Sequence, residues 1–108
     1  MQISSEIVKE MVDRIVNRFQ PIKVIIFGSW ARGEARPDSD IDILIIMECE
    51  KADYLEVMAE IRRELRDFRV PKDIIVANPE TIDKFGNMNG YIYVSALTEG
   101  LVMYERAV

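Results

Sequence analysis

The 108-residue sequence predicts an α/β domain in which helices pack on a small, mixed, partly parallel sheet. Three short runs are almost wholly apolar, as strands buried on both faces of a sheet are: residues 23–27, 42–47 and 73–77. Two longer segments, one before the first run and one before the third, have apolar residues three and four positions apart, the spacing of amphipathic helices. No repeat or linker interrupts this order, so residues 1–108 are expected to form one domain.

The first helix is predicted over residues 5–19, where the apolar residues form a single stripe. Ser4 or Ser5 is its expected N-cap, because a serine side chain can accept a hydrogen bond from a free N–H group of the first turn. Pro21 follows its end, where a proline cannot continue the helix. Lys23 then opens the first strand.

The second helix is predicted over residues 54–68. Asp53 is its expected N-cap, and Glu56 stands three residues later in a capping-box arrangement. Pro71 stops this helix before the third strand. Gly100 suits the position just past a later helix. The rest of the chain predicts two short helices and a last edge strand, over residues 79–86, 91–99 and 101–105.

Composition and charge exclude several classes of protein. With 14 Lys and Arg against 19 Asp and Glu, the net charge is −5, which argues against direct nucleic-acid binding through phosphate neutralisation. The chain has no histidine, so catalytic triads and zinc sites that need imidazole are excluded. The single cysteine, Cys49, fits a reducing compartment. No signal peptide or membrane-spanning run is visible, so we expect a cytoplasmic protein without membrane contact.

A Gly-Ser pair lies where the first apolar run ends. Gly28 closes that run, and Ser29 would begin a turn or helix. Backbone N–H groups at such a point can bind an anion, glycine lets a phosphate approach the backbone, and the serine hydroxyl can donate to it. Taken alone, the pair is also an ordinary turn dipeptide. It therefore predicts a phosphate site only in combination with other features.

Three acidic residues supply that combination. Asp40 and Asp42 flank one residue at the start of the second run, so their side chains point the same way on an extended chain. Two such carboxylates repel unless a cation lies between them, and oxygen ligands suit Mg²⁺ or Mn²⁺. Asp73 opens the third run and would lie about 5 Å from Asp42 if the two strands pair. Three carboxylates could then hold two ions about 3.5–4 Å apart, as nucleotidyl transfer requires. Each acid taken singly could instead be a solvated strand end.

Together these features resemble the nucleotidyltransferase superfamily related to DNA polymerase beta, and within it the minimal, antitoxin-type nucleotidyltransferases. The pattern Gly-Ser-x-Ala-Arg-Gly followed by Ser-Asp-x-Asp is matched at Gly28, Ser29, Ala31, Arg32, Gly33, Ser39, Asp40 and Asp42. The ending over residues 96–105 is similar as well. The resemblance covers most of the chain and implies the polymerase beta palm-like α/β fold.

The resemblance also implies roles for several of these residues and for Asp73. Gly28 and Ser29 would hold the phosphates of ATP, and Asp40 and Asp42 would bind two Mg²⁺ or Mn²⁺ ions. Asp73 would be the third ligand and would help to deprotonate an attacking hydroxyl. Its assignment rests on position alone, because a lysine stands directly before it.

The charge of the motif independently favours a metal requirement. From residue 28 to residue 42, two arginines stand against four acids: Arg32 and Arg36 against Glu34, Asp38, Asp40 and Asp42. A polyphosphate would not enter this acidic site unless divalent cations first reversed its sign. Arg32 could neutralise phosphate, or it could brace the loop by pairing with an acid.

The function implied is transfer of AMP from ATP to a hydroxyl of a partner protein. In the resembled family the partner is a HEPN-type toxin, an all-helical ribonuclease, which the antitoxin silences by adenylylating a tyrosine. A chain of 108 residues has no room for an acceptor domain, so we expect a partner or a second copy to present the acceptor. The alternatives are a non-catalytic antitoxin that acts by binding, and a nucleotidyltransferase that modifies an antibiotic or other small molecule.

Two further groups of residues allow either a binding or a structural interpretation. A basic stripe runs along the second helix at Arg62, Arg66 and Arg69, and a solvated face is the simpler explanation. Three aromatic residues could stack on a base or meet a partner, although packing is commoner at such positions: Trp30, Tyr91 and Tyr93.

Overall fold

The computed structural model describes residues 4–36 and 39–107 and has the expected α/β architecture. Asp38, counted above in the charge of the motif, lies outside the described residues. A 3-10 turn, η1 (Lys51–Asp53), lies between the second strand and the second helix. The other elements, in chain order, are α1 (Ser5–Phe19), β1 (Lys23–Phe27), β2 (Ile41–Ile46), α2 (Tyr54–Glu64), β3 (Lys72–Ala77), α3 (Pro79–Phe85), α4 (Ile92–Glu99) and β4 (Leu101–Glu105).

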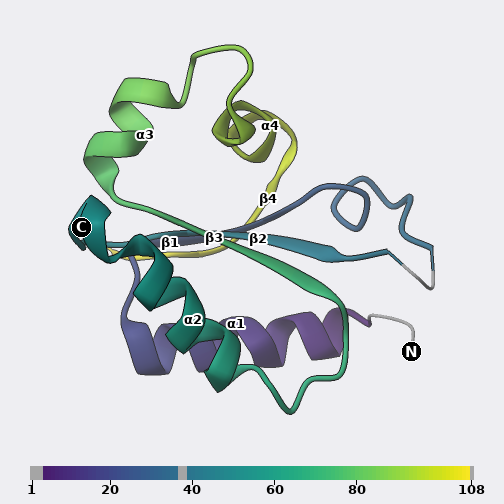
Figure 1. Cartoon of the computed structure of the whole chain (residues 1–108). Helices are drawn as coiled ribbons and strands as arrows, with labels where there is room; N and C mark the ends of the chain where they lie inside the picture. Colours follow the sequence, from purple (N-terminus) through teal and green to yellow (C-terminus); the bar gives the residue numbers. More distant parts are fainter. Residues whose placement is uncertain (1–3, 37–38, 108) are drawn as a thin grey trace.

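The four strands form one mixed sheet in the order β3-β2-β1-β4. β1 is antiparallel to both β2 and β4, whereas β2 and β3 run parallel. α1 and α2 cover one face of the sheet, and α3 and α4 lie over the other (Figure 1). Within the described ranges, none of the helices combines the length and the apolar character that a membrane crossing requires.

Hydrophobic clusters lie on both faces of the sheet, which is why the central strands read as continuous apolar runs. Ile43 and Ile45 of β2 belong to the cluster formed with α1 and α2. The alternate residues Leu44 and Ile46 belong to the opposite cluster, which includes Ala96 of α4. This alternation fixes which face of the sheet each neighbouring polar residue occupies.

Some predicted boundaries and one cap are wrong. α2 ends at Glu64 instead of residue 68, because the chain passes into turns there, with Phe68 N–H donating to the Leu65 carbonyl at 3.0 Å. Asp53 precedes α2, but its side chain makes no capping bond: it ends η1 at φ −97° and ψ 1°, far from the extended conformation of a capping residue. β2 begins and ends one residue earlier than expected, and β3 already includes Lys72. The cap of α1 is Ser4, whose hydroxyl accepts from Ile7 N–H at 3.2 Å.

Candidate active site

The parallel pairing of β2 and β3 brings two of the predicted acids side by side. Asp42 is the second residue of β2, and its register partner across the parallel ladder is Asp73. On its other side, Asp42 is opposite Phe27, the last residue of β1. Register partners lie about 5 Å apart and point to the same face of a sheet. The sequence predicted that the two acids would lie close together if these strands paired. The structure confirms both the pairing and the proximity.

Both acids face the α3 and α4 side of the sheet. Asp42 alternates with Ile41 and Ile43, which point into the cluster with α1 and α2. Lys72, which precedes Asp73, points away from the acids, because its ammonium donates to the Phe68 carbonyl at 2.8 Å. Burial lowers the pKa of Lys72, and Asp67 partly offsets this effect. The lysine therefore does not neutralise Asp73.

The carboxyl of Asp42 is in an unfavourable electrostatic environment. Its pKa is raised, first by partial burial, then by repulsion from Asp73 and from Asp40, and only Arg32 acts in the opposite direction. Asp40 is exposed and lies just before β2. Asp73 and Asp40 thus both lie within electrostatic reach of Asp42, at the end of the sheet where β1 stops.

Gly28 packs directly against Asp42. Its φ is +78°, in the left-handed region that favours glycine. A Cβ atom at this position would collide with Oδ2 of Asp42 and lie 3.0 Å from its Cγ. Glycine is therefore needed here for two reasons, the backbone conformation and the space that the carboxylate occupies.

The loop after Gly28 is a series of turns, so the alternative of a helix beginning at Ser29 is wrong. The Gly28 carbonyl accepts from Arg32 N–H at 3.2 Å, and the Ser29 carbonyl accepts from Glu34 N–H at 2.8 Å. Ser29 is partly exposed beside the glycine. Any phosphate held here would meet turn N–H groups and a serine hydroxyl, without a helix dipole.

Arg32 links this loop to α4. Its guanidinium pairs with Glu34 at 3.1 Å and with Glu99, the last residue of α4, at 3.5 Å. It also lowers the pKa of Asp42. The arginine thus braces the loop, and its positive charge lies near the acids as well. Sequence reasoning missed Glu99, since nothing in the pattern links an acid at the end of α4 to a loop 67 residues earlier.

The donor atoms suit a hard divalent cation, but in the described residues they are not gathered around a single point. Asp42, Asp73 and Asp40 supply only oxygen ligands, and their mutual repulsion is the kind that a divalent cation relieves. Within residues 4–36 and 39–107, no three acidic or cysteine side chains surround a single point as a metal site would. The three acids thus fit Mg²⁺ or Mn²⁺ in chemistry and charge.

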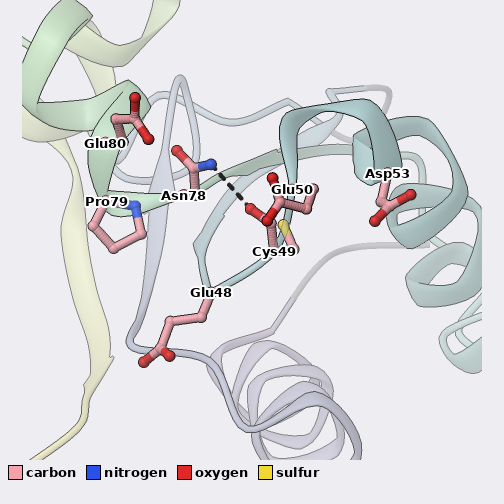
Figure 2. A pocket seen from close by; sticks show the side chains of 7 residues that line it. All are labelled: Glu48, Cys49, Glu50, Asp53, Asn78, Pro79 and Glu80. Atoms are coloured by element: carbon pink, nitrogen blue, oxygen red, sulfur yellow. Dashed lines mark hydrogen bonds between the residues drawn. The ribbon is translucent and has the colours of Figure 1, made fainter.

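A cavity of about 650 Å³ lies at the opposite end of the sheet, away from the motif. It is lined by Glu48, Cys49, Glu50, Asp53, Asn78, Pro79 and Glu80 (Figure 2). The Asn78 amide donates to the Cys49 carbonyl at 2.9 Å, which ties β3 to the segment after β2. Burial, followed by Asp53 and Glu50, raises the pKa of the Cys49 thiol, so this is not an activated cysteine.

The other residues considered for binding either lie on the surface as exposed charges or pack against neighbouring side chains. Arg66 and Arg69 lie beyond the end of α2, so the predicted basic stripe does not lie on one helix, although all its members are exposed. Tyr91 stacks on Phe85 and on Tyr93, with ring centroids 4.6 and 6.5 Å apart. Trp30 packs against the core cluster on the α1 and α2 side.

The fold and the motif are those of a nucleotidyltransferase, and comparison with known proteins agrees. A sequence model of the nucleotidyltransferase domain matches residues 6–102. A candidate protein adenylyltransferase of Methanocaldococcus jannaschii, MJ0604, is 32% identical over 99 residues, which cover 90% of this chain and 94% of that protein. Protein adenylyltransferase MntA of Thermococcus cleftensis is 39% identical over 56 residues, which cover 44% of this chain and 57% of MntA.

Solved structures extend the agreement to the fold. The crystal structure of a candidate nucleotidyltransferase from Sulfolobus solfataricus matches with a TM-score of 0.65 at 25% identity, over 94% of this chain and 79% of that one. A toxin–antitoxin complex with AMP-PNP matches in fold, with a TM-score of 0.56 at 14% identity, over 91% of this chain and 73% of that one. The chain belongs to the nucleotidyltransferase domain family, and the predicted resemblance to its minimal members is confirmed.

Proposed function

We propose that this protein transfers AMP from ATP to a hydroxyl of a partner protein, in a reaction that depends on Mg²⁺ or Mn²⁺. The observation that carries the proposal is the register pair Asp42 and Asp73, on one face of the sheet and beside Gly28. A protein that acts only by binding has no use for adjacent acids that repel each other at the end of a phosphate-binding motif. The relatives named as protein adenylyltransferases support the same reaction.

The reaction needs one bond to form and one to break. The acceptor oxygen attacks the α-phosphorus of ATP, the bond to the bridging oxygen breaks, and pyrophosphate leaves while AMP remains on the acceptor. Asp73, an exposed carboxylate, takes the hydroxyl proton and passes it to water. Gly28 and Ser29 hold the phosphates, and Arg32 adds a positive charge beside them.

Asp40, Asp42 and Asp73 would hold the ions. When bound, the divalent cations offset the charge of the α-phosphate and of the leaving pyrophosphate. Without a cation, the chain's own acids would repel ATP from the motif, because Asp42 already faces two like charges and one arginine. Excess chelator should therefore abolish the saturable binding of ATP. An ATP affinity by calorimetry that is unchanged in chelator would contradict the metal requirement.

We further propose that the acceptor is a tyrosine of a HEPN-type helical toxin encoded by the neighbouring reading frame, and that both proteins act in the cytoplasm. The likeness in fold to a chain of a toxin–antitoxin structure with AMP-PNP is consistent with such a pair. Adenylylation adds a bulky, negatively charged group, which can block a ribonuclease site.

The test is to incubate the chain with ATP, Mg²⁺ and the product of the neighbouring reading frame, and to measure the intact mass of that product. It should gain one or more AMP units. The Asp40→Asn and Asp42→Asn double variant should transfer none, and Asp73→Asn none or far less. Asp13→Asn is the matched control, since Asp13 is an exposed acid on α1.

Two results would overturn the proposal. If the double variant labels the partner at the wild-type rate, the site is wrongly assigned. If the wild type suppresses its partner's activity in a tight complex while the partner's mass stays unchanged, the protein acts by occlusion.

A further inference from the structure

One stretch of the chain is almost free of charge. Residues 87–104 carry a single charged side chain, Glu99, although charged residues make up 31% of the whole sequence. The stretch includes α4 and nearly all of β4. We call it the uncharged segment. A surface helix and strand ordinarily carry charges on their solvent side, so this depletion needs an explanation.

The uncharged segment is exposed instead of buried. Ile92 and Leu97 of α4 are 47% and 37% exposed, and Leu101, Val102 and Met103 of β4 are 46%, 52% and 36% exposed. Apart from Leu55 on α2, the large hydrophobic side chains left exposed in the described chain fall in this segment. Loss of charge together with exposed apolar and aromatic residues is the composition of an interface core.

β4 also offers unpaired backbone groups. It lies at one edge of the sheet, with β1 as its strand partner, so its outer N–H and C=O groups have no neighbouring strand among the described residues. Proteins usually protect such an edge with charges or proline. From Leu101 to Tyr104 there is neither. The edge is therefore suited to contact with another protein chain.

The uncharged segment borders the candidate active site. α4 lies on the same face of the sheet as Asp42 and Asp73, and it packs over β1. Its last residue, Glu99, pairs with Arg32 in the loop after Gly28. The opposite face is covered by α1 and α2 (Figure 1). A protein that delivers a hydroxyl to these acids must therefore approach over the face that α4 occupies.

We propose that the acceptor protein docks on the uncharged segment and thereby places its hydroxyl at Asp42 and Asp73; this inference rests on the proposed function. The position of the segment selects this occupant over a second copy of the chain. Glu99 of the segment pairs with Arg32, whose charge also acts on Asp42, so a protein bound on the segment lies beside the acids that must receive the hydroxyl. Ion pairs at the edge of the segment present charges of both signs, Glu34 and Glu99 with Arg32 and Glu105 with Lys23, around its apolar centre.

The experiment compares two variants of the segment with one matched control. Ile92→Asp introduces a charge at the first residue of α4, where an acid is compatible with the helix terminus. Val102→Thr makes the edge strand polar but keeps a residue that favours strands. The control is Leu55→Asp, an equally drastic change at the second residue of α2, where the side chain is 80% exposed.

The probe is the product of the neighbouring reading frame, used as the acceptor at varied concentration with fixed ATP and Mg²⁺. Ile92→Asp should raise KM for the acceptor by about tenfold or more, as loss of an interface anchor does. Val102→Thr should raise it less. At saturating acceptor, kcat should stay within about twofold, and Leu55→Asp should match the wild type in both constants. Melting temperatures verify that each variant is folded.

Direct binding of the two proteins, measured by calorimetry without ATP, separates this inference from the proposed function. If AMP is not transferred even by the wild type, the proposed function fails, and weakened binding by Ile92→Asp still supports the docking surface. If all three variants bind and react like the wild type, the docking surface is wrong and the proposed function stands. A wild-type dimer that Ile92→Asp converts to a monomer would overturn the proposal in favour of a second copy.

Discussion

Substitution of Gly28 by alanine should damage both the stability and the activity of the protein. A residue with a side chain at φ +78° costs about 1–2 kcal/mol. The new Cβ would also collide with Oδ2 of Asp42, so the carboxylate must leave its rotamer, at a further cost of about 0.5–1.5 kcal/mol. The sum is about 1.5–3.5 kcal/mol, which corresponds to a fall in melting temperature of roughly 6–28 °C for a domain of this size.

Gly33 provides a control that separates the two costs. Its φ is +73°, but a Cβ added there would meet nothing within 4 Å. Gly33→Ala should therefore lose only the conformational part, about 1–2 kcal/mol, and should keep transfer activity. In Gly28→Ala the displaced Asp42 should lower kcat by at least about tenfold, because catalytic geometry tolerates little displacement.

A double-mutant cycle tests the assigned contact. In an Asp42→Ala background the collision is absent, so Gly28→Ala should cost no more than Gly33→Ala does in the wild type. Urea unfolding monitored by circular dichroism supplies the free energies of unfolding. If Gly28→Ala is no more destabilising than Gly33→Ala, or if its cost is unchanged when Asp42 is replaced, the close packing of this glycine on the acid is refuted.

Three further predictions concern neighbouring groups. Without metal, Asp42→Asn should be more stable than the wild type at neutral pH by less than about 1 kcal/mol, because the carboxyl is half solvated. Since the folded-state pKa is raised, this difference should shrink as pH falls toward about 4 and the wild-type acid takes up a proton, as urea unfolding at several pH values would reveal. Tyr54→Phe should cost about 1–3 kcal/mol in the same assay, because the hydroxyl accepts from Asn78 N–H at 2.7 Å and the donor would lose its partner. Arg32→Gln should weaken ATP binding by calorimetry more than Glu99→Gln does, and equal effects would mean that the arginine acts only as a brace.

The order and type of the elements could be predicted because local signals agree with the tertiary structure. The apolar stripe of α1 is buried at Val8, Met11, Val12 and Ile15. Pro79 and the cap Asn78, whose side chain accepts from Thr81 N–H at 2.8 Å, place the start of α3 at residue 79, where the sequence predicted it. The errors arose where backbone groups hydrogen-bond to one another in turns. Asp53, for example, ends a 3-10 turn, and its side chain does not cap α2.

The sequence correctly placed Gly100 just past a helix, but the structure shows a different reason why a glycine is needed there. A glycine just past a helix suggests a left-handed cap, yet its φ is −76°. The glycine is needed instead because a Cβ would run into the carbonyl of Ala96 and into Ile25. Such a contact joins the end of α4 to β1, and sequence periodicity carries no information about that distance.

The motif around Gly28 and Asp42 could be identified from sequence because its parts are adjacent in the chain. The pairing of Asp73 with Asp42 could only be stated conditionally, since strand order and register are properties of the whole sheet. The brace between Arg32 and Glu99, and the exposed edge of β4, depend on that same order. They therefore became visible only in the structure.

The register of β3 explains why two acids stay together although a lysine is next in sequence. A slip of one residue would place Lys72 opposite Asp42 and would relieve the repulsion. The same slip would turn Ile74 and Val76 out of the cluster with α1 and α2. All the remaining side chains of the strand would move to the opposite face as well. Burial of these side chains outweighs one unfavourable charge contact, at about 1.5–3 kcal/mol for each large aliphatic residue. The core thus holds Asp73 against Asp42, and a divalent cation would turn that repulsion into a binding site.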